Sequence, residues 1–303
     1  LKASLLPLLK YAESGRWHFP FAPHDLGTYP LANGQVYGGR ETSQTDQMPV
    51  EESGNMLLMI AAISKIEGNA NLAAAYWPLL EKWAAYLKQE GLDPANQLST
   101  DDFAGHLAHN ANLSVKAIEA LGAFATLCDL RGMKDQAKLY RETASDFAAK
   151  WITLARDDDH YRLAFDKPGT WSQKYNLVWD NILGLHLFPA QVADTETAFY
   201  LTKENRFGFP LDNRKAYTKL DWEFWSATLS PTQDRFERLI APVYDWANQS
   251  PGRVPLTDWY WTDSGKQAGF QARSVVGGLY IKMLADPATW AKWAHRPPAS
   301  FPK

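Results

Sequence analysis

Residues 112–155 read NLSVKAIEALGAFATLCDLRGMKDQAKLYRETASDFAAKWITLA. Apolar residues recur at the 3.6-residue spacing of a helix over 112–131 and again over 134–155. Gly132 lies between the two runs and is a typical helix stop. The segment therefore predicts two helices joined by a short turn.

The same periodicity continues outward in both directions. Pro49 and a pair of glutamates mark one helix start, and glycines such as Gly68 mark helix ends. No stretch shows a convincing strand alternation. We predict eleven helices, at residues 2–14, 51–67, 71–90, 112–131, 134–155, 174–187, 191–204, 218–228, 232–249, 266–284 and 287–295.

These helices fall into hairpins, and the long connections lie mainly between one hairpin and the next. Five pairs follow half a pair, which predicts an all-α fold, an (α/α)6 toroid of helical hairpins lacking its first N-terminal helix. A plain α-solenoid would show a tighter repeat of about 34 to 47 residues. We predict one domain over residues 1–303. The opening LKASLL has no start methionine, so we expect a fragment of a longer protein.

The composition excludes several classes of protein. Apolar residues make up 46% of the 303 residues and charged residues 21%, which is typical of a chain with a substantial core. The net charge is only −3 without a basic run, so we expect no nucleic-acid partner. No apolar stretch is long enough to span a membrane, and no signal peptide is recognisable. The single cysteine, Cys128, excludes an internal disulfide and a cysteine-rich zinc site.

Tryptophan is unusually frequent, with thirteen residues. Indole rings in loops could stack on sugar rings, whereas indoles within helices would fill a large core. The loop tryptophans Trp171, Trp259 and Trp261 fit the first interpretation better.

The candidate catalytic residues are acids grouped at loop–helix junctions. Asp101 and Asp102 are adjacent in a loop before the helix at 112–131, and we favour Asp102 as the functional one. Hydrolysis often needs one protonated and one ionised carboxyl group. Helix capping is the alternative explanation for such acids. We expect no metal or cofactor.

Three further acidic clusters are candidates. Asp221 and Glu223 flank Trp222 near a helix start, where the helix dipole alone could explain acids. Glu51 and Glu52 begin another helix. The third pair, His24 and Asp25, lies in a long loop rich in proline and glycine, and long structureless loops are usually functional.

The chain resembles the glutaminase A family through seven segments in order. They are APHDLG at 22–27, MPVEESGNM at 48–56, STDDFAG at 99–105, YNL at 175–177, GFPLDNR at 208–214, YTKLDWE at 217–223 and ARSVVGG at 272–278. Family members often read Glu-Glu-Cys-Gly-Asn where this chain has Ser53, which argues against a cysteine nucleophile there.

The resemblance implies a six-hairpin toroid with β-sandwich-type domains upstream, in a secreted or periplasmic protein. It also implies hydrolysis of L-glutamine to glutamate and ammonia. Carboxylates would then activate water, and a cation such as Arg214 or Arg273 would hold the α-carboxylate.

Two other functions stay open. The toroid is similar to glucoamylase-like glycosidases, so an inverting glycoside hydrolase could use Asp102 as acid and Glu223 or Glu52 as base. A non-catalytic helical scaffold is the third possibility. The substrate is accordingly a small molecule or a glycan.

Overall fold

A computed structural model describes residues 1–28, 34–36, 41–100 and 102–294, with the side chains of Asp102 and Ala294 outside the description. It divides into two compact units, residues 1–192 and residues 193–303. Both units lie in residues 1–303, for which the sequence predicted a single domain. The single domain remains a prediction. Among the described residues, no helix is long and apolar enough to cross a membrane.

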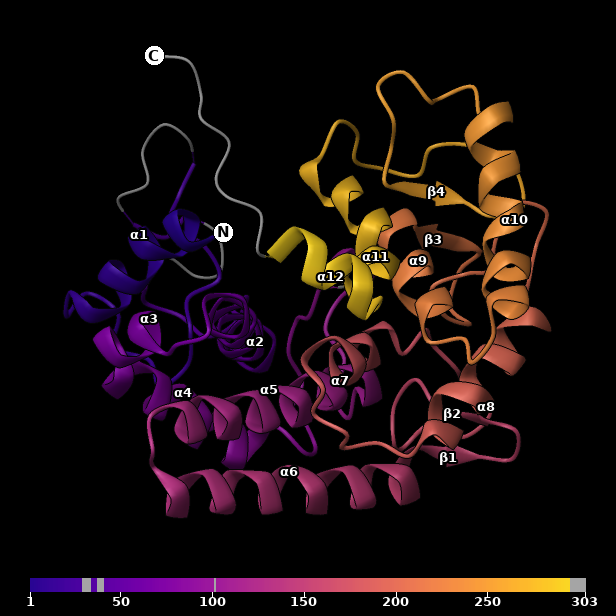
Figure 1. The fold of residues 1–303 in the computed structure, drawn as a ribbon. Coiled ribbons are helices and arrows are strands. Elements are labelled where there is room, and N and C mark those ends of the chain that lie inside the picture. The colour runs from indigo at the N-terminus through magenta and orange to yellow at the C-terminus, as the bar shows by residue number, and fades with distance from the viewer. Residues whose placement is uncertain (29–33, 37–40, 101, 295–303) are drawn as a thin grey trace. The chain divides into compact units, whose positions relative to one another are not determined.

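The first unit is built around helix α5 (Ala111–Leu130), which is buried along nearly its whole length. Asn110 caps its start by accepting hydrogen bonds from the backbone N–H groups of Asn112 and Leu113, at 3.0 and 3.1 Å. Helix α6 (Lys134–Ala155) runs beside it after a short turn at Gly132 (Figure 1). The predicted hairpin is therefore confirmed.

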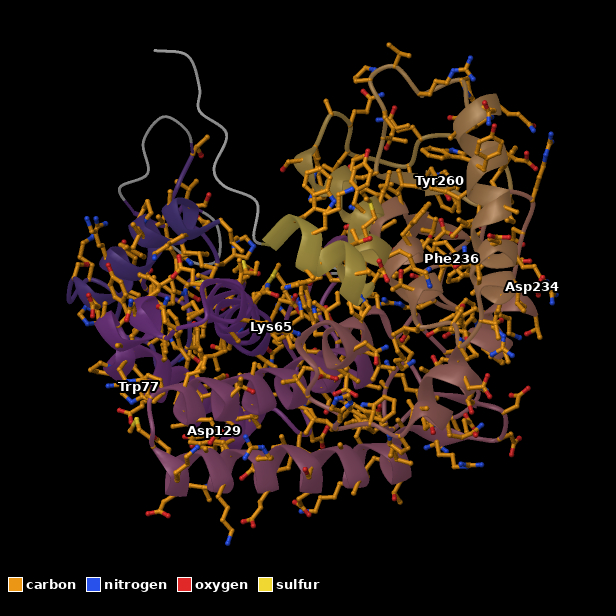
Figure 2. All side chains as sticks on the ribbon, viewed as in Figure 1. Lys65, Trp77, Asp129, Asp234, Phe236 and Tyr260 are labelled. Carbon is orange, nitrogen blue, oxygen red and sulfur yellow. The ribbon has the colours of Figure 1, made fainter. Side chains whose placement is uncertain are left out.

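The contacts between α5 and its neighbours are both polar and aromatic. Asp129, labelled in Figure 2, lies near the end of α5 and accepts hydrogen bonds from Lys134 and Arg141 of α6. Trp77 stacks on Phe124 of α5 with ring centroids 5.0 Å apart. A buried indole thus wedges between helices, which is the core interpretation of the tryptophan content.

Further helices of this unit pack against α5. Helix α2 packs along α5, and α4 packs against both. The elements are α1 (Lys2–Glu13), α2 (Pro49–Glu67), α3 (Asn71–Ala75), α4 (Trp77–Glu90), the 3₁₀ turn η1 (Asp102–Ala104), β1 (Arg156–Asp157), β2 (His160–Tyr161), the 3₁₀ turn η2 (Tyr175–Leu177) and α7 (Val178–Leu183).

The second unit combines helices with a small antiparallel ribbon. Strand β3 (Tyr217–Lys219) pairs with β4 (Trp259–Trp261), and Lys219 lies opposite Trp259. The remaining elements are α8 (Ala190–Leu201), which begins just before the unit boundary, α9 (Leu220–Thr228), α10 (Gln233–Gln249), η3 (Ser274–Tyr280), α11 (Ile281–Ala285) and α12 (Pro287–Ala294).

Three predicted helices differ from the structure. The helix at 71–90 is split at Tyr76, because Pro78 has no N–H to donate to the preceding turn. The helix at 174–187 is the 3₁₀ turn η2 followed by α7, which ends at Gly184. The helix at 266–284 begins only at Ser274, because preceding residues bridge to the β4 region instead. The short strands β1 to β4 were not predicted.

Candidate functional site

The first candidate site lies at the start of α2. Pro49 occupies the first turn, where its missing N–H costs nothing, and Glu51 and Glu52 follow in the same turn. The backbone N–H of Val50 donates to Oε1 of Gln97 at 3.0 Å. This bond ties the loop that leads to Asp101 to the beginning of the helix.

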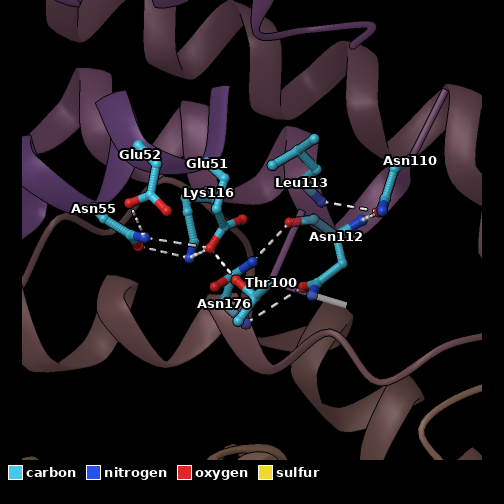
Figure 3. A network of polar contacts seen from close by, with 9 residues as sticks. All are labelled: Glu51, Glu52, Asn55, Thr100, Asn110, Asn112, Leu113, Lys116 and Asn176. Atoms are coloured by element: carbon cyan, nitrogen blue, oxygen red, sulfur yellow. Dashed lines mark hydrogen bonds and ion pairs between the residues drawn. The ribbon is translucent and has the colours of Figure 1, made fainter. Parts of the chain in front are cut away.

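Glu51 is held in a buried ion pair. Both the ammonium of Lys116 on α5 and the hydroxyl of Thr100 donate to Oε1 of Glu51 (Figure 3). Lys116 also donates to Oδ1 of Asn55 at 2.7 Å. Glu51 and Lys116 are both buried, so each charge depends on the other for compensation.

Gly54 makes this pairing possible. A Cβ at this position would lie 2.7 Å from Cγ and 3.2 Å from Cδ of Lys116. The lysine stem therefore crosses α2 directly over the glycine to reach Glu51. That close approach explains a glycine in a helix interior, where it otherwise costs about 1 kcal/mol.

Glu52 differs from its neighbour in environment. Burial, followed by the charge of Glu51, raises its pKa from 4.5 to about 7, although His24, Asn55 and Lys116 act in the opposite direction. Asn55 donates to its Oε2 at 3.2 Å. One carboxyl group is thus locked in an ion pair, while the adjacent one can exchange a proton near neutral pH.

The loop at residues 22–27 is anchored to the same helix. The N–H of Ala22 donates to the Ser53 hydroxyl at 3.1 Å, which brings His24 into the electrostatic environment of Glu52. Asp25 accepts from the N–H groups of Gly27 and Val36 at 2.8 Å each. These bonds give Asp25 a role in shaping the loop.

Asp101 and Asp102 are the adjacent loop acids of which the sequence favoured Asp102, and both side chains lie outside the described part of the structure. Asp101 lies outside the described residues, and Asp102 begins η1 but its side chain is not described. Thr100, which precedes them directly, touches Glu51. The catalytic roles of Asp101 and Asp102 remain predictions.

Glu223 lies in the second unit and is fully enclosed. The N–H of Phe209 donates to its Oε1 at 2.8 Å, and Oη of Tyr260 lies 2.5 Å from its Oε2 (Figure 2 labels Tyr260). The same Oη lies 2.9 Å from the carbonyl oxygen of Phe207. Burial raises the pKa of Glu223 well above its usual value. The N–H of Phe209 and the hydroxyl of Tyr260 are thus both donors to the buried carboxyl group of Glu223.

Gly208 adjoins this buried acid. It has a φ of +121°, and a Cβ there would lie 2.1 Å from Oε1 of Glu223. These contacts are enough to explain why a glutamate is buried at this position. The catalytic role of Glu223 remains a prediction.

A cluster of charged residues in the second unit surrounds Asp221. The ammonium of Lys219 bonds to Oδ2 of Asp258, and Arg273 lies 3.9 Å from the same oxygen. Burial raises the pKa of Asp221 to about 6, against the opposing charge of Lys219. Trp222 is buried, and the Lys219 ammonium lies 5.1 Å from its ring centroid.

The other predicted substrate-binding residues have mixed positions. Arg214 donates through Nε and Nη2 to Asp212 at 3.0 and 2.6 Å. Trp171 is buried in the first unit. Trp259 and Trp261 are half-buried on β4, and their rings lie at 89° and 69° to the ring of Tyr217. None of these three indoles is a widely exposed platform.

Sequence reasoning missed Lys116, Asn55 and Thr100 in the first unit, and Lys219 and Asp258 in the second. One signal was available: Lys116 is a charged residue inside an otherwise apolar run, where a charge needs a partner. The others follow only from packing. Within the described ranges, no group of three or more His, Cys, Asp or Glu side chains could hold a metal ion.

Comparison with known proteins identifies the class. The model of the glutaminase A six helical-hairpin domain matches residues 1–283. The chain belongs to this family, which confirms the predicted all-α fold of helical hairpins and the resemblance drawn from the motifs.

Two curated relatives are fungal. Glutaminase A of Aspergillus oryzae (strain ATCC 42149 / RIB 40) is 37% identical over 294 residues, covering 94% of this chain and 41% of that protein. A protein of Arthroderma benhamiae (strain ATCC MYA-4681 / CBS 112371) named probable glutaminase/05536 is 28% identical over 373 residues, covering 94% and 43%. The chain therefore spans about two fifths of the length of these relatives.

Proposed function

We propose that this chain carries the hydrolytic site of a glutaminase-like hydrolase, and that Glu52 is its proton-transfer group. The observation that supports the proposal is the contrast between Glu51, locked by Lys116, and Glu52, whose pKa of about 7 suits both directions of proton transfer. The names of the two fungal relatives support glutamine as the substrate.

The proposed reaction uses Glu52 first as a base and then as an acid. Its carboxylate accepts a proton from water as the water oxygen attacks the side-chain amide carbon of L-glutamine. The carboxylic acid then returns the proton to the amide nitrogen while the carbon–nitrogen bond breaks, giving glutamate and ammonia. The Glu51–Lys116 ion pair lies beside Glu52 and engages the neighbouring carboxylate, so the proton transfer is assigned to Glu52.

The test is ammonia release from L-glutamine by the full-length protein, measured beside reducing-sugar release from a panel of glycans. Glu52→Gln should lower kcat by about 100-fold or more. Glu67→Gln is the matched control, because Glu67 ends the same helix and pairs with exposed Lys2 at 2.9 Å. The wild-type rate should change with an inflection near pH 7.

Other outcomes would replace the proposal. Sugar release without ammonia would make the protein a glycoside hydrolase, and no turnover of either kind would leave a binding scaffold. Full activity of Glu52→Gln would remove Glu52 from catalysis. Asp102→Asn, assayed in parallel, tests the acid favoured from the sequence. Export from the cell and upstream β-sandwich-type domains also remain predictions.

A further inference from the structure

The second unit gathers four charged side chains around the start of α9. Strand pairing sets Lys219 opposite Trp259, and Asp258 directly precedes Trp259. The N–H of Leu220 donates to the carbonyl oxygen of Asp258 at 2.8 Å. Asp221 follows in the first turn of α9. The ribbon and the helix start therefore bring Lys219, Asp221 and Asp258 together.

Two carboxylate oxygens of this cluster have no hydrogen-bond donor among the described residues. Oδ2 of Asp258 bonds to the Lys219 ammonium. Oδ1 of Asp258 and Oδ1 of Asp221 are both buried, and neither has a hydrogen-bond partner within the part of the chain that the structure describes. Buried polar atoms are nearly always hydrogen-bonded, and an unsatisfied one costs about 1–3 kcal/mol. Two such oxygens in one cluster are acceptors that a donor group of a ligand could use.

Arg273 forms the exposed edge of the same cluster. Its guanidinium lies 4.4 Å from the ring centroid of Phe270 and 3.9 Å from Oδ2 of Asp258. The side chain is 39% exposed, so its donors can reach a ligand. A guanidinium binds a carboxylate through two parallel N–H bonds. Arg214 of the same unit is less suited, because Asp212 already engages its Nε and Nη2.

The charges of the cluster decide the class of ligand. Two acids, Asp221 and Asp258, face two bases, Lys219 and Arg273, so the ionised cluster is neutral. A simple cation or anion would unbalance it, whereas a zwitterion would not. An ammonium has three N–H donors and no acceptor, which matches the two unsatisfied oxygens.

We infer that Asp221 and Asp258 bind the α-ammonium group, and Arg273 the α-carboxylate, of a free amino acid. Gly278 closes the cluster on another side, because a Cβ there would lie 2.7 Å from Cβ of Asp221. The choice of glutamine as the ligand to be tested rests on the proposed function. The recognition of the α-amino-acid group itself does not.

The test is calorimetric titration of the full-length Glu52→Gln protein, which is expected to bind without turnover. L-Glutamine is compared with N-acetyl-L-glutamine, which lacks the ammonium, and with the α-amide of L-glutamine, which lacks the carboxylate. Each analogue should bind about tenfold or more weakly than L-glutamine, because each loses a charge-assisted hydrogen bond. Equal affinity of the N-acetyl compound would overturn the inference.

Two further variants in this background test the named residues. Asp221→Asn removes the charge at nearly constant shape, and Arg273→Gln removes the guanidinium. Each should weaken L-glutamine binding about tenfold or more. Arg206→Gln is the matched control, since its guanidinium also lies over a ring, 4.7 Å from the centroid of Phe207. Thermal melts establish that the variants are folded.

The outcomes separate this inference from the proposed function. Unchanged binding in Asp221→Asn and Arg273→Gln, or no binding of L-glutamine at millimolar concentration, would overturn the site. If wild-type protein then still released ammonia through Glu52, the proposed function would stand without it. Conversely, L-glutamine binding that is lost in Arg273→Gln, together with no hydrolysis by the wild-type protein, would support the binding site and not the proposed function.

Discussion

Replacing Glu52 by glutamine should stabilise the protein at alkaline pH. The pKa of Glu52 is about 7 in the folded protein, against 4.5 for the free side chain. Between these values the unfolded chain has released its proton while the folded protein keeps it. Unfolding is therefore favoured as pH rises, and the stabilising effect of the proton, complete below pH 4.5, is lost through pH 7.

The size of the effect follows from the two pKa values. A difference of about 2.5 pKa units corresponds to about 3.4 kcal/mol at high pH, since one unit is about 1.4 kcal/mol. Relative to its value at low pH, the free energy of unfolding of the wild-type protein is lowered by this linkage by about 0.8 kcal/mol at pH 5 and by about 3.3 kcal/mol at pH 8. Glutamine does not titrate. The free energy of unfolding of Glu52→Gln, relative to wild type, should therefore rise by about 2.5 kcal/mol between pH 5 and pH 8.

Urea denaturation of both proteins at several pH values measures this difference. Glu67→Gln serves again as control, because Glu67 is an exposed partner of Lys2 at the other end of α2. A constant difference between Glu52→Gln and wild type across this pH range would refute the reasoning. The expected gain in stability, together with the expected loss of turnover, is typical of a residue kept for function.

The other predictions concern buried contacts. Lys116→Met should lower the free energy of unfolding by about 3–5 kcal/mol, because it leaves the Glu51 carboxylate buried without its cation. Denaturant melts measure this loss, and most of it should be recovered when Glu51→Gln is added to Lys116→Met. Lys138→Met is the control: it breaks the exposed pair of Lys138 with Glu142 and should lower the free energy of unfolding by under about 1 kcal/mol. Gly208→Ala should cost at least about 2 kcal/mol, because its φ of +121° is strained for alanine and its Cβ meets Glu223. A thermal melt unchanged from wild type would contradict that account.

Residues close together in the chain were predicted well. Helices α5 and α6 were predicted with ends within a residue or two, because the 3.6-residue apolar pattern and the stop at Gly132 are local features. The start of α2 at Pro49 follows from the same kind of signal. Pro78 is also a local signal, for the break between α3 and α4. The prediction missed this break because apolar residues continue at helical spacing on both sides of it.

The ribbon of β3 and β4 could not be predicted in this way. Each strand has three residues, too few for an alternating pattern, and the partners are about forty residues apart. Strand pairing at that range depends on how the intervening helices pack. The predicted helix at 266–284 starts only at Ser274 for the same reason, since the residues before it bridge to the ribbon region.

The sequence by itself determined the helical class, the family and the set of acids from which a site could be built. Only the tertiary structure decided how those acids differ. It pairs Glu51 with Lys116 across 65 positions, places Glu52 beside them where burial and the charge of Glu51 raise its pKa, and encloses Glu223. The protonation of a carboxyl group depends on burial and on charges within a few ångströms, and those neighbours come from distant parts of the chain.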